Sequence, residues 1–227
     1  MGDYQLTILS PQGDAWDVTE RVSTLSWSGS VKRVSRQIEA VMATPNDGSL
    51  PELPCDLGNE LRLSVQGAQR FLGHIVTREK ATDSSTTELT GLDRGRFLSG
   101  NEGLYTFSGT APEAAVRALC ADFGIPVGSL AETGVQVARK YPGVALSKMV
   151  DSLYTMAAEQ NGKRYLSRFN GAGELEVVEK PEAAALEIAP RKNLQTLRVT
   201  EDISGLQNAV ARNITSPMIG IYLEQIR

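Results

Sequence analysis

The N-terminal part of the chain alternates hydrophobic and polar residues over short stretches, which is the pattern of half-buried β-strands. Within residues 36–43, Ile38, Ala40 and Met42 occupy one side of the expected strand, and polar residues occupy the other. The same alternation predicts further strands at 4–9, 22–27, 61–65, 71–77 and 88–93. Gly67 separates two of these runs and predicts a hairpin. Short strands with frequent turns favour a small antiparallel barrel or sandwich over a parallel α/β sheet.

One well-marked helix, residues 110–123, follows these strands. Thr110 and Glu113 have the spacing of a capping box, and Pro112 suits the first turn of a helix. The hydrophobic positions of this helix form one stripe, made of Val116, Leu119, Cys120 and Phe123. Gly124 predicts the C-terminal end, and Pro126 prevents the helix from restarting. The stripe predicts a packing element that carries no reactive group.

A second helix and a hairpin are predicted further along. The helix covers residues 146–160 and ends at Asn161-Gly162, although its start lacks a good cap. Strands at 163–169 and 174–179 flank a glycine-rich turn and predict a hairpin. Together with the first helix they indicate a small α+β unit, whereas residues 135–141 are ambiguous. Beyond an alanine-rich connector at 181–190, strands are expected at 196–201 and 208–215, too few to close a second barrel.

Composition narrows the class of protein. The 227 residues are 41% hydrophobic and 22% charged, with a net charge of −4, as in a soluble globular protein. The acidic balance argues against a nucleic-acid-binding surface spread over the whole protein. No signal peptide and no run of 18 apolar residues is seen, so we expect a cytoplasmic product that is not anchored in a membrane. Cys55 and Cys120 lack metal-ligand or CxxC spacing, which predicts free thiols in a reducing compartment.

The residue types needed for catalysis or metal binding are scarce. His74 is the only histidine and lies in the middle of a predicted strand, where a half-exposed structural histidine is favoured over a general base. The turn at 45–48 offers too few oxygens for a Ca²⁺ or Mg²⁺ site. The glycines at 170–173 join two strands and do not lead into a helix, as a phosphate-binding loop would. We therefore expect no catalytic residue, no cofactor and no metal.

Charged and aromatic residues are present but show no diagnostic spacing. No two of the candidate carboxylates are marked as a glycosidase-type pair: Glu20, Glu39, Asp56, Glu60, Glu79 and Asp93. The basic residues near strand ends are expected to pair with carboxylates, including across a subunit boundary: Lys32, Arg33, Arg36, Arg62, Arg70, Arg78, Arg94 and Arg96. The aromatics are too scattered to predict a carbohydrate platform: Trp16, Trp27, Tyr105 and Phe107. The absence of a chemical signature favours a structural role.

An ordered series of segments carries a resemblance to a known family. The segments are residues 57–63, 71–76, 92–94, 105–107, 118–134 and 146–178. In this order they resemble the baseplate hub proteins of contractile phage tails and of the related defective prophages and bacteriocin particles. The resemblance covers about residues 57–180, and none of its motifs is catalytic.

The resemblance implies an architecture and a set of partners. Hub proteins carry two tube-like β-barrel domains, so that three chains form a ring of six barrels between the sixfold tail tube and the threefold spike. We accordingly expect a mainly β protein with a tube-type antiparallel barrel at 1–105, an inserted α+β domain at 106–185 and a partial second β domain at 186–227, truncated relative to the family. The expected state is a homotrimer in the virion tail baseplate. It would contact tail tube, central spike and other baseplate proteins, and DNA would pass through its lumen without specific binding.

Two alternatives from other functional classes remain open. A glycan- or peptidoglycan-acting accessory enzyme of the tail would need two carboxylates facing one another across a cleft. A carbohydrate-binding β module would need clustered, exposed aromatic side chains. The hub interpretation instead predicts that sheet edges and apolar strand faces mediate assembly, with acidic residues lining the channel.

Overall fold

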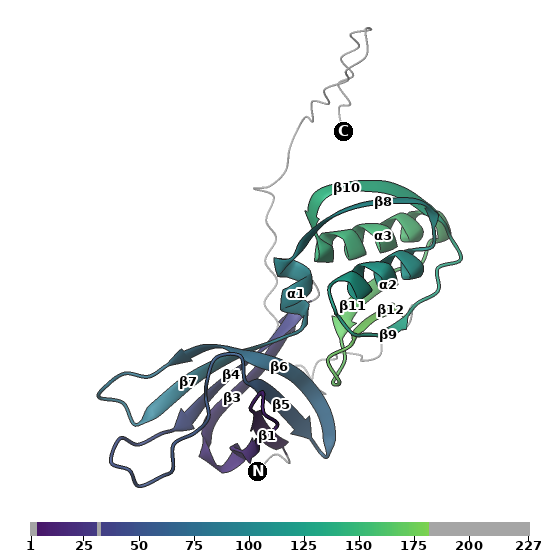
Figure 1. Ribbon diagram of the computed structural model, residues 1–227. Helices are drawn as coiled ribbons and strands as arrows, with labels where there is room; N and C mark the ends of the chain where they lie inside the picture. Colours follow the sequence, from purple (N-terminus) through teal and green to yellow (C-terminus); the bar gives the residue numbers. More distant parts are fainter. Residues whose placement is uncertain (1–3, 31–32, 182–227) are drawn as a thin grey trace, which may run out of the picture. The chain divides into compact units, whose positions relative to one another are not determined.

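The computed structural model describes residues 4–30 and 33–181 and shows a mainly β chain with a few helices (Figure 1). The first part is an antiparallel sheet of seven strands in the order β2-β1-β5-β6-β7-β4-β3. Its strands are β1 (Tyr4–Leu9), β2 (Ala15–Asp17), β3 (Val22–Ser30), β4 (Arg33–Ala43), β5 (Glu60–Val65), β6 (Ala68–Glu79) and β7 (Thr86–Asp93), with a 3-10 turn, η1 (Thr19–Arg21), after β2. The predicted strands and the β5–β6 hairpin are therefore confirmed.

The predicted closed barrel is not found in the described residues, because the sheet ends at two unpaired edges, β2 and β3. The strand β2 is only three residues long, too short for a ladder that would close the sheet. One face of the sheet buries a hydrophobic core instead, to which the loop before β5 adds Cys55. In the pairing of β1 with β5, Leu6 lies opposite Leu63 and Ile8 lies opposite Leu61. The buried hydrophobic residues of the two strands therefore face the same side of the sheet.

The second part of the described chain is an α+β unit with its own core. Its elements are α1 (Gly95–Gly100), β8 (Glu102–Thr110), α2 (Pro112–Asp122), β9 (Val127–Leu130), β10 (Val137–Ala145), α3 (Leu146–Asn161), β11 (Tyr165–Phe169) and β12 (Leu175–Glu179). The strands β8 and β10 form an antiparallel two-stranded ribbon, and β9, β12 and β11 form a three-stranded sheet with one parallel pair. The two helices α2 and α3 pack between these sheets (Figure 1).

Helix α2 differs in detail from the sequence prediction. It begins at Pro112 with Ala111 as N-cap, so the predicted capping box is wrong: Thr110 ends β8, and Glu113 accepts a hydrogen bond from Thr133. Of the predicted stripe, three residues are buried, but Phe123 follows the last helical residue and is 37% exposed. The strand before the helix holds Thr110 in an extended ladder, which overrides its local capping preference.

The second helix and the hairpin agree with the prediction. Helix α3 ends at Asn161, and Gly162 adopts the left-handed conformation of a C-cap, with φ 73°. Its inward face buries the hydrophobic residues Leu146, Met149, Val150, Leu153, Tyr154 and Ala157. The β11–β12 hairpin pairs residues 165–169 with 175–179. Of the ambiguous residues 135–141, those from Val137 onward belong to β10, whose register contains two bulges.

Strand β4 belongs to both hydrophobic cores. Its C-terminal half contributes Ile38, Ala40 and Met42 to the core of the seven-stranded sheet. Its N-terminal half places Val34 against the core of the α+β unit, to which α1 contributes Leu98. Strand β4 therefore packs against both the core of the seven-stranded sheet and the core of the α+β unit.

The domain boundaries expected from the sequence, at 105 and 185, stay a prediction. The expected partial second β domain at 186–227, the connector at 181–190 and the strands at 196–201 and 208–215 lie outside the described residues, apart from Pro181.

The C-cap of α3 gives a test of this fold. Gly162→Ala places a side chain at positive φ in otherwise open space, so the free energy of unfolding should fall by about 1 kcal/mol. The matched control is Gly100→Ala, which also has open space but no positive φ and should change stability by less than about 0.5 kcal/mol. Urea unfolding followed by circular dichroism measures both, and equal losses would contradict the cap assignment.

Candidate interaction surfaces

The outer edge of β3 is the longest unpaired strand edge of the seven-stranded sheet. No described strand pairs with it over residues 22–28, and the sequence of β3 contains neither a charged residue nor a proline. Trp27 lies on this strand and is 44% exposed, with the guanidinium of Arg36 5.5 Å from its ring centre. Natural sheets protect edges with short strands, charges or proline. The opposite edge, β2, is protected by its length, whereas β3 is open to pairing with another chain.

A buried ion pair lies where β4, β7 and α1 meet. The Nε of Arg36 is 3.4 Å from Oδ2 of Asp93, whose side chain is 1% exposed. The other carboxylate oxygen of Asp93 accepts a hydrogen bond from the amide of Gly95 at 2.9 Å. The guanidinium also donates to the carbonyls of Phe169 and Asn170 at the β11–β12 turn. The pair thus connects the sheet, the start of α1 and the hairpin.

Burial is the main influence on the Asp93 carboxyl. It raises the pKa of Asp93, and the hydrogen bonds from Arg36, Ser35 and Gly95 oppose that rise. Gly95 must be a glycine because a Cβ there would lie 2.7 Å from Cα of Ser35. All of these contacts are internal, so the pair is a structural junction and offers no reactive group to a substrate.

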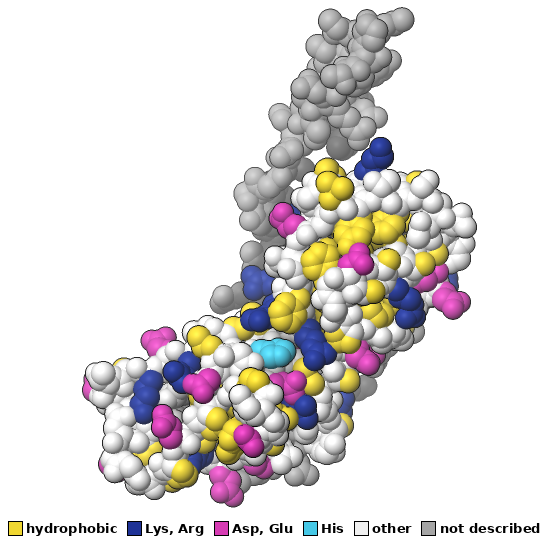
Figure 2. Space-filling view, viewed as in Figure 1, with side chains coloured by type: hydrophobic (Ala, Val, Ile, Leu, Met, Phe, Trp, Pro, Cys, Tyr) yellow, Lys and Arg dark blue, Asp and Glu magenta, His cyan; other side chains and the backbone are white. Residues whose placement is uncertain are grey.

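A second cluster combines basic and aromatic side chains at the beginning of α1. His74, on β6, lies opposite Glu60 on β5 and is half-buried in mid-strand, as predicted. Its ring centre is 6.3 Å from that of Phe97, and the guanidinium of Arg96 lies 4.6 Å from the same phenyl ring. Burial lowers the pKa of His74, and Arg96 lowers it further. Figure 2 shows the histidine, in cyan, at the surface among basic and hydrophobic side chains.

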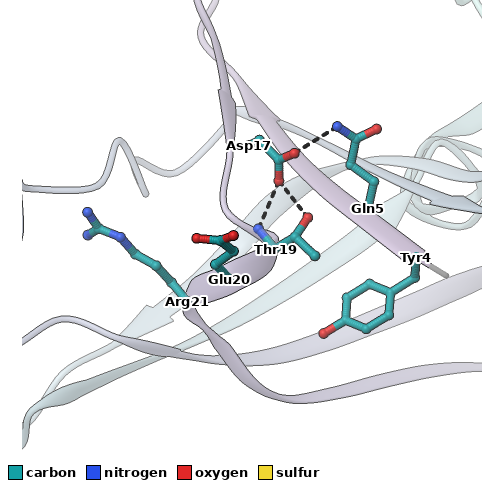
Figure 3. A pocket seen from close by; sticks show the side chains of 6 residues that line it. All are labelled: Tyr4, Gln5, Asp17, Thr19, Glu20 and Arg21. Atoms are coloured by element: carbon teal, nitrogen blue, oxygen red, sulfur yellow. Dashed lines mark hydrogen bonds between the residues drawn. The ribbon is translucent and has the colours of Figure 1, made fainter. Parts of the chain in front are cut away.

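A hollow lies beside β1, β2 and η1 (Figure 3), and a catalytic cleft would need a pair of suitable carboxylates there. Two carboxylates line it, Asp17 and Glu20. Asp17 accepts hydrogen bonds from Gln5 at 2.8 Å and from the amide and hydroxyl of Thr19 at 3.0 and 2.5 Å. These bonds, that from the Thr19 hydroxyl above all, lower the pKa of Asp17. A glycosidase acid needs a raised pKa, which Asp17 does not have.

The other carboxylates considered from the sequence are mostly engaged locally. Glu39 accepts from Gln37 at 2.6 Å, Asp56 pairs with Arg78 at 3.1 Å, and Glu60 pairs with Arg62. Glu79 is exposed at the end of β6. The expected pairing of arginines with carboxylates is therefore found for Arg36, Arg62 and Arg78, but no carboxylate pairs with Arg70, Arg94 or Arg96 within the described residues.

Residues 4–30 and 33–181 contain neither a metal-binding cluster nor a membrane-spanning helix. No group of three His, Cys, Asp or Glu side chains there could hold a metal ion. None of the helices in these segments is long and apolar enough to span a membrane. Both cysteines are buried and unpaired, and burial raises the pKa of each thiol to about 11.

The aromatic residues do not form a common platform. Trp16 packs against the core of the large sheet, whereas Tyr105 and Phe107 stack on each other at 5.9 Å and pack against the α+β core. Sequence reasoning missed the Arg36–Asp93 junction and the grouping of His74 with Arg96. The only sequence signal for either was Asp93-Arg94-Gly95-Arg96, a charged run directly after a predicted strand.

The chain matches a known protein family over most of its length. Residues 25–212 match the model of the YQBQ-like family, which is most of the chain, and the protein therefore belongs to that family. Over 111 residues it is 27% identical to the phage-like element PBSX protein XkdQ of Bacillus subtilis, a match that covers 49% of this chain and 33% of XkdQ.

Solved tail proteins share the fold. The 43 kDa tail protein of prophage MuSo2 from Shewanella oneidensis matches with a TM-score of 0.62 at 15% identity, covering 77% of this chain and 53% of that one. A tail protein from Neisseria meningitidis matches with a TM-score of 0.57 at 17% identity, covering 77% and 50%. The chain thus spans about half of these solved proteins and a third of XkdQ.

Removing Asp93 tests the junction. Asp93→Ala leaves the guanidinium of Arg36 without its buried partner, and the free energy of unfolding should fall by about 3 kcal/mol. The control is Asp56→Ala, which breaks the exposed pair with Arg78 and should cost less than about 1 kcal/mol. Chemical unfolding measures both variants, and a loss at Asp93 no larger than that at Asp56 would contradict the junction.

The thiols provide a second test. With a pKa of about 11, only about 0.1% of each thiol is ionised at pH 8, and both are buried. We expect Cys55 and Cys120 to be unreactive toward Ellman's reagent in the native protein and to react fully in 6 M guanidinium chloride. Rapid modification of the native protein at pH 8 would show that a thiol is accessible.

Proposed function

We propose that this protein is a structural component of a phage tail or phage-tail-like particle and contributes to the baseplate hub between tail tube and central spike. The observation that carries the proposal is the fold, which two tail proteins share over 77% of this chain. The relationship to a protein of a phage-like element supports the same setting. The hub position rests on the sequence resemblance described above.

The mechanism we propose is assembly through the open edge of β3. An unpaired strand edge presents backbone N–H and C=O groups to a neighbouring strand, and β3 has no charge or proline to prevent pairing. A ring needs a heterologous contact, in which the β3 edge of one copy pairs with a different segment of the next copy, and we expect that ring to be a trimer. Acidic residues facing the channel would repel DNA phosphates and let DNA pass.

The role proposed is non-catalytic. An accessory enzyme would use a general acid with a raised pKa, whereas the pKa of Asp17, in the hollow beside β1, is lowered. A carbohydrate-binding module would require grouped, exposed aromatics, whereas the stacked pair of Tyr105 and Phe107 packs against the α+β core. The proposed assembly role instead uses the unpaired edge of β3.

Labelling of particles tests the location. An epitope inserted after Gly48, in an exposed turn, should leave the sheet intact. Antibody-gold electron microscopy of particles made in the producing strain should place the label at one end of the tail, where the tube meets the spike. Label along the whole tube, or no label on particles, would overturn the hub proposal.

Charged residues on β3 test the mechanism. The double variant Thr24→Lys and Ser28→Lys introduces charge at two exposed positions of the edge and should abolish self-association and reduce incorporation into particles at least about tenfold. The control, Ala15→Lys, changes the opposite, short edge and should assemble normally. Light scattering across protein concentration and blotting of purified particles give the two readouts. Normal incorporation of the double variant would contradict edge pairing.

A further inference from the structure

We propose that the surface formed by His74, Arg94, Arg96 and Phe97, the His74 patch, binds an acidic segment of a partner protein. This inference is independent of the hub position. It rests on how these four side chains are arranged and on the carboxylates that surround them.

The positive charge of the patch has no counter-charge in the described part of the chain. The carboxylate that acts on the charge of His74 is that of Glu60, and it is bound to Arg62. The carboxylate of Asp93 is buried and bound to Arg36 and the amide of Gly95. Neither Arg94 nor Arg96 forms an ion pair with any described residue. Two guanidinium groups therefore stand beside an imidazole without an anionic partner.

One nitrogen of His74 and one of Arg96 are turned inward from the surface. Nδ1 of His74 and Nε of Arg96 are both buried and have no hydrogen-bond partner among the described residues. Nε2 of His74 and the two terminal nitrogens of Arg96 make no hydrogen bond to a described residue. They are also absent from the buried atoms without a partner, so they are exposed at the surface. Phe97 separates the two groups and holds the Arg96 guanidinium over its ring. The outer guanidinium nitrogens of Arg96 therefore offer N–H donors beside a phenyl ring, a grouping that suits carboxylate oxygens.

The mixed character of the patch favours a protein partner over DNA. Arginine and aromatic side chains together are typical of the energetic centres of protein interfaces. A DNA-binding surface requires a wide positive field, whereas this chain has a net charge of −4 and pairs many of its other cations internally. The turn between β11 and β12 borders the patch, since a Cβ at Gly173 would lie 3.6 Å from Cδ of Arg94. A short acidic segment fits a surface of this kind.

The test uses a fluorescein-labelled deca-glutamate peptide as the probe. Its affinity for the intact protein is measured by fluorescence anisotropy at 50 and 150 mM NaCl, with a deca-glutamine peptide and a 20-base-pair DNA duplex as competitors. We expect binding of the acidic peptide and competition by neither alternative. In the same titration, the NMR signals of the single imidazole should move, and the pKa of His74 should rise, because added carboxylates favour the charged form.

Two double variants of equal charge separate the patch from general electrostatics. Arg94→Gln with Arg96→Gln should weaken peptide binding at least about tenfold. The control, Arg117→Gln with Lys148→Gln, removes two exposed cations from α2 and α3 and should bind like the unmodified protein. Each pair shifts the net charge by −2, from −4 to −6.

Three results would overturn the inference. The first is an equal loss of peptide affinity in both double variants. The second is that the imidazole signals of the unmodified protein do not move at millimolar peptide. The third is that the protein binds DNA more tightly than the peptide. The NMR result does not depend on whether the variants fold. Absence of the protein from purified particles, together with intact peptide binding, would count against the hub role alone.

Discussion

The packing of strand β4 into two hydrophobic cores is the constraint on which the rest of the described structure depends. Its C-terminal half lies in the core of the seven-stranded sheet, and Val34 lies in that of the α+β unit. Between these halves, Arg36 binds Asp93 at the end of β7 and the carbonyls at the β11–β12 turn. A buried ion pair is weak evidence for stability in itself, but it fixes register where one strand serves two cores.

This arrangement determines which surfaces remain for partners. Because β4 is paired with β7 on one side and β3 on the other, β3 becomes the edge of the sheet. The same junction places α1 after β7, and with it Arg96 and Phe97 beside His74. The open strand edge and the basic aromatic patch are thus two consequences of one connection.

Local sequence patterns predicted most of the strands and helices. They did not predict that the seven-stranded sheet stays open, or that Arg36 and Asp93 form a buried pair. Alternation located β4 because Ile38, Ala40 and Met42 face one core, and Gly162 located the end of α3. The capping box at Thr110 failed because the ladder of β8 holds that residue in an extended conformation. The α1 helix is too short for hydrophobic periodicity to reveal. Arg36 and Asp93 are 57 positions apart, and only the sheet topology brings them together.

The fold class follows from patterns within single strands, whereas barrel closure depends on which edges meet. The family match and the shared fold support a tail protein, and the central claim is that it assembles through β3. A reconstruction of the intact particle by electron cryo-microscopy, at a resolution that separates strands, tests this most directly. We expect a strand of a neighbouring subunit to be hydrogen-bonded along residues 22–28 of β3. A β3 edge that faces solvent in the assembled tail would contradict it.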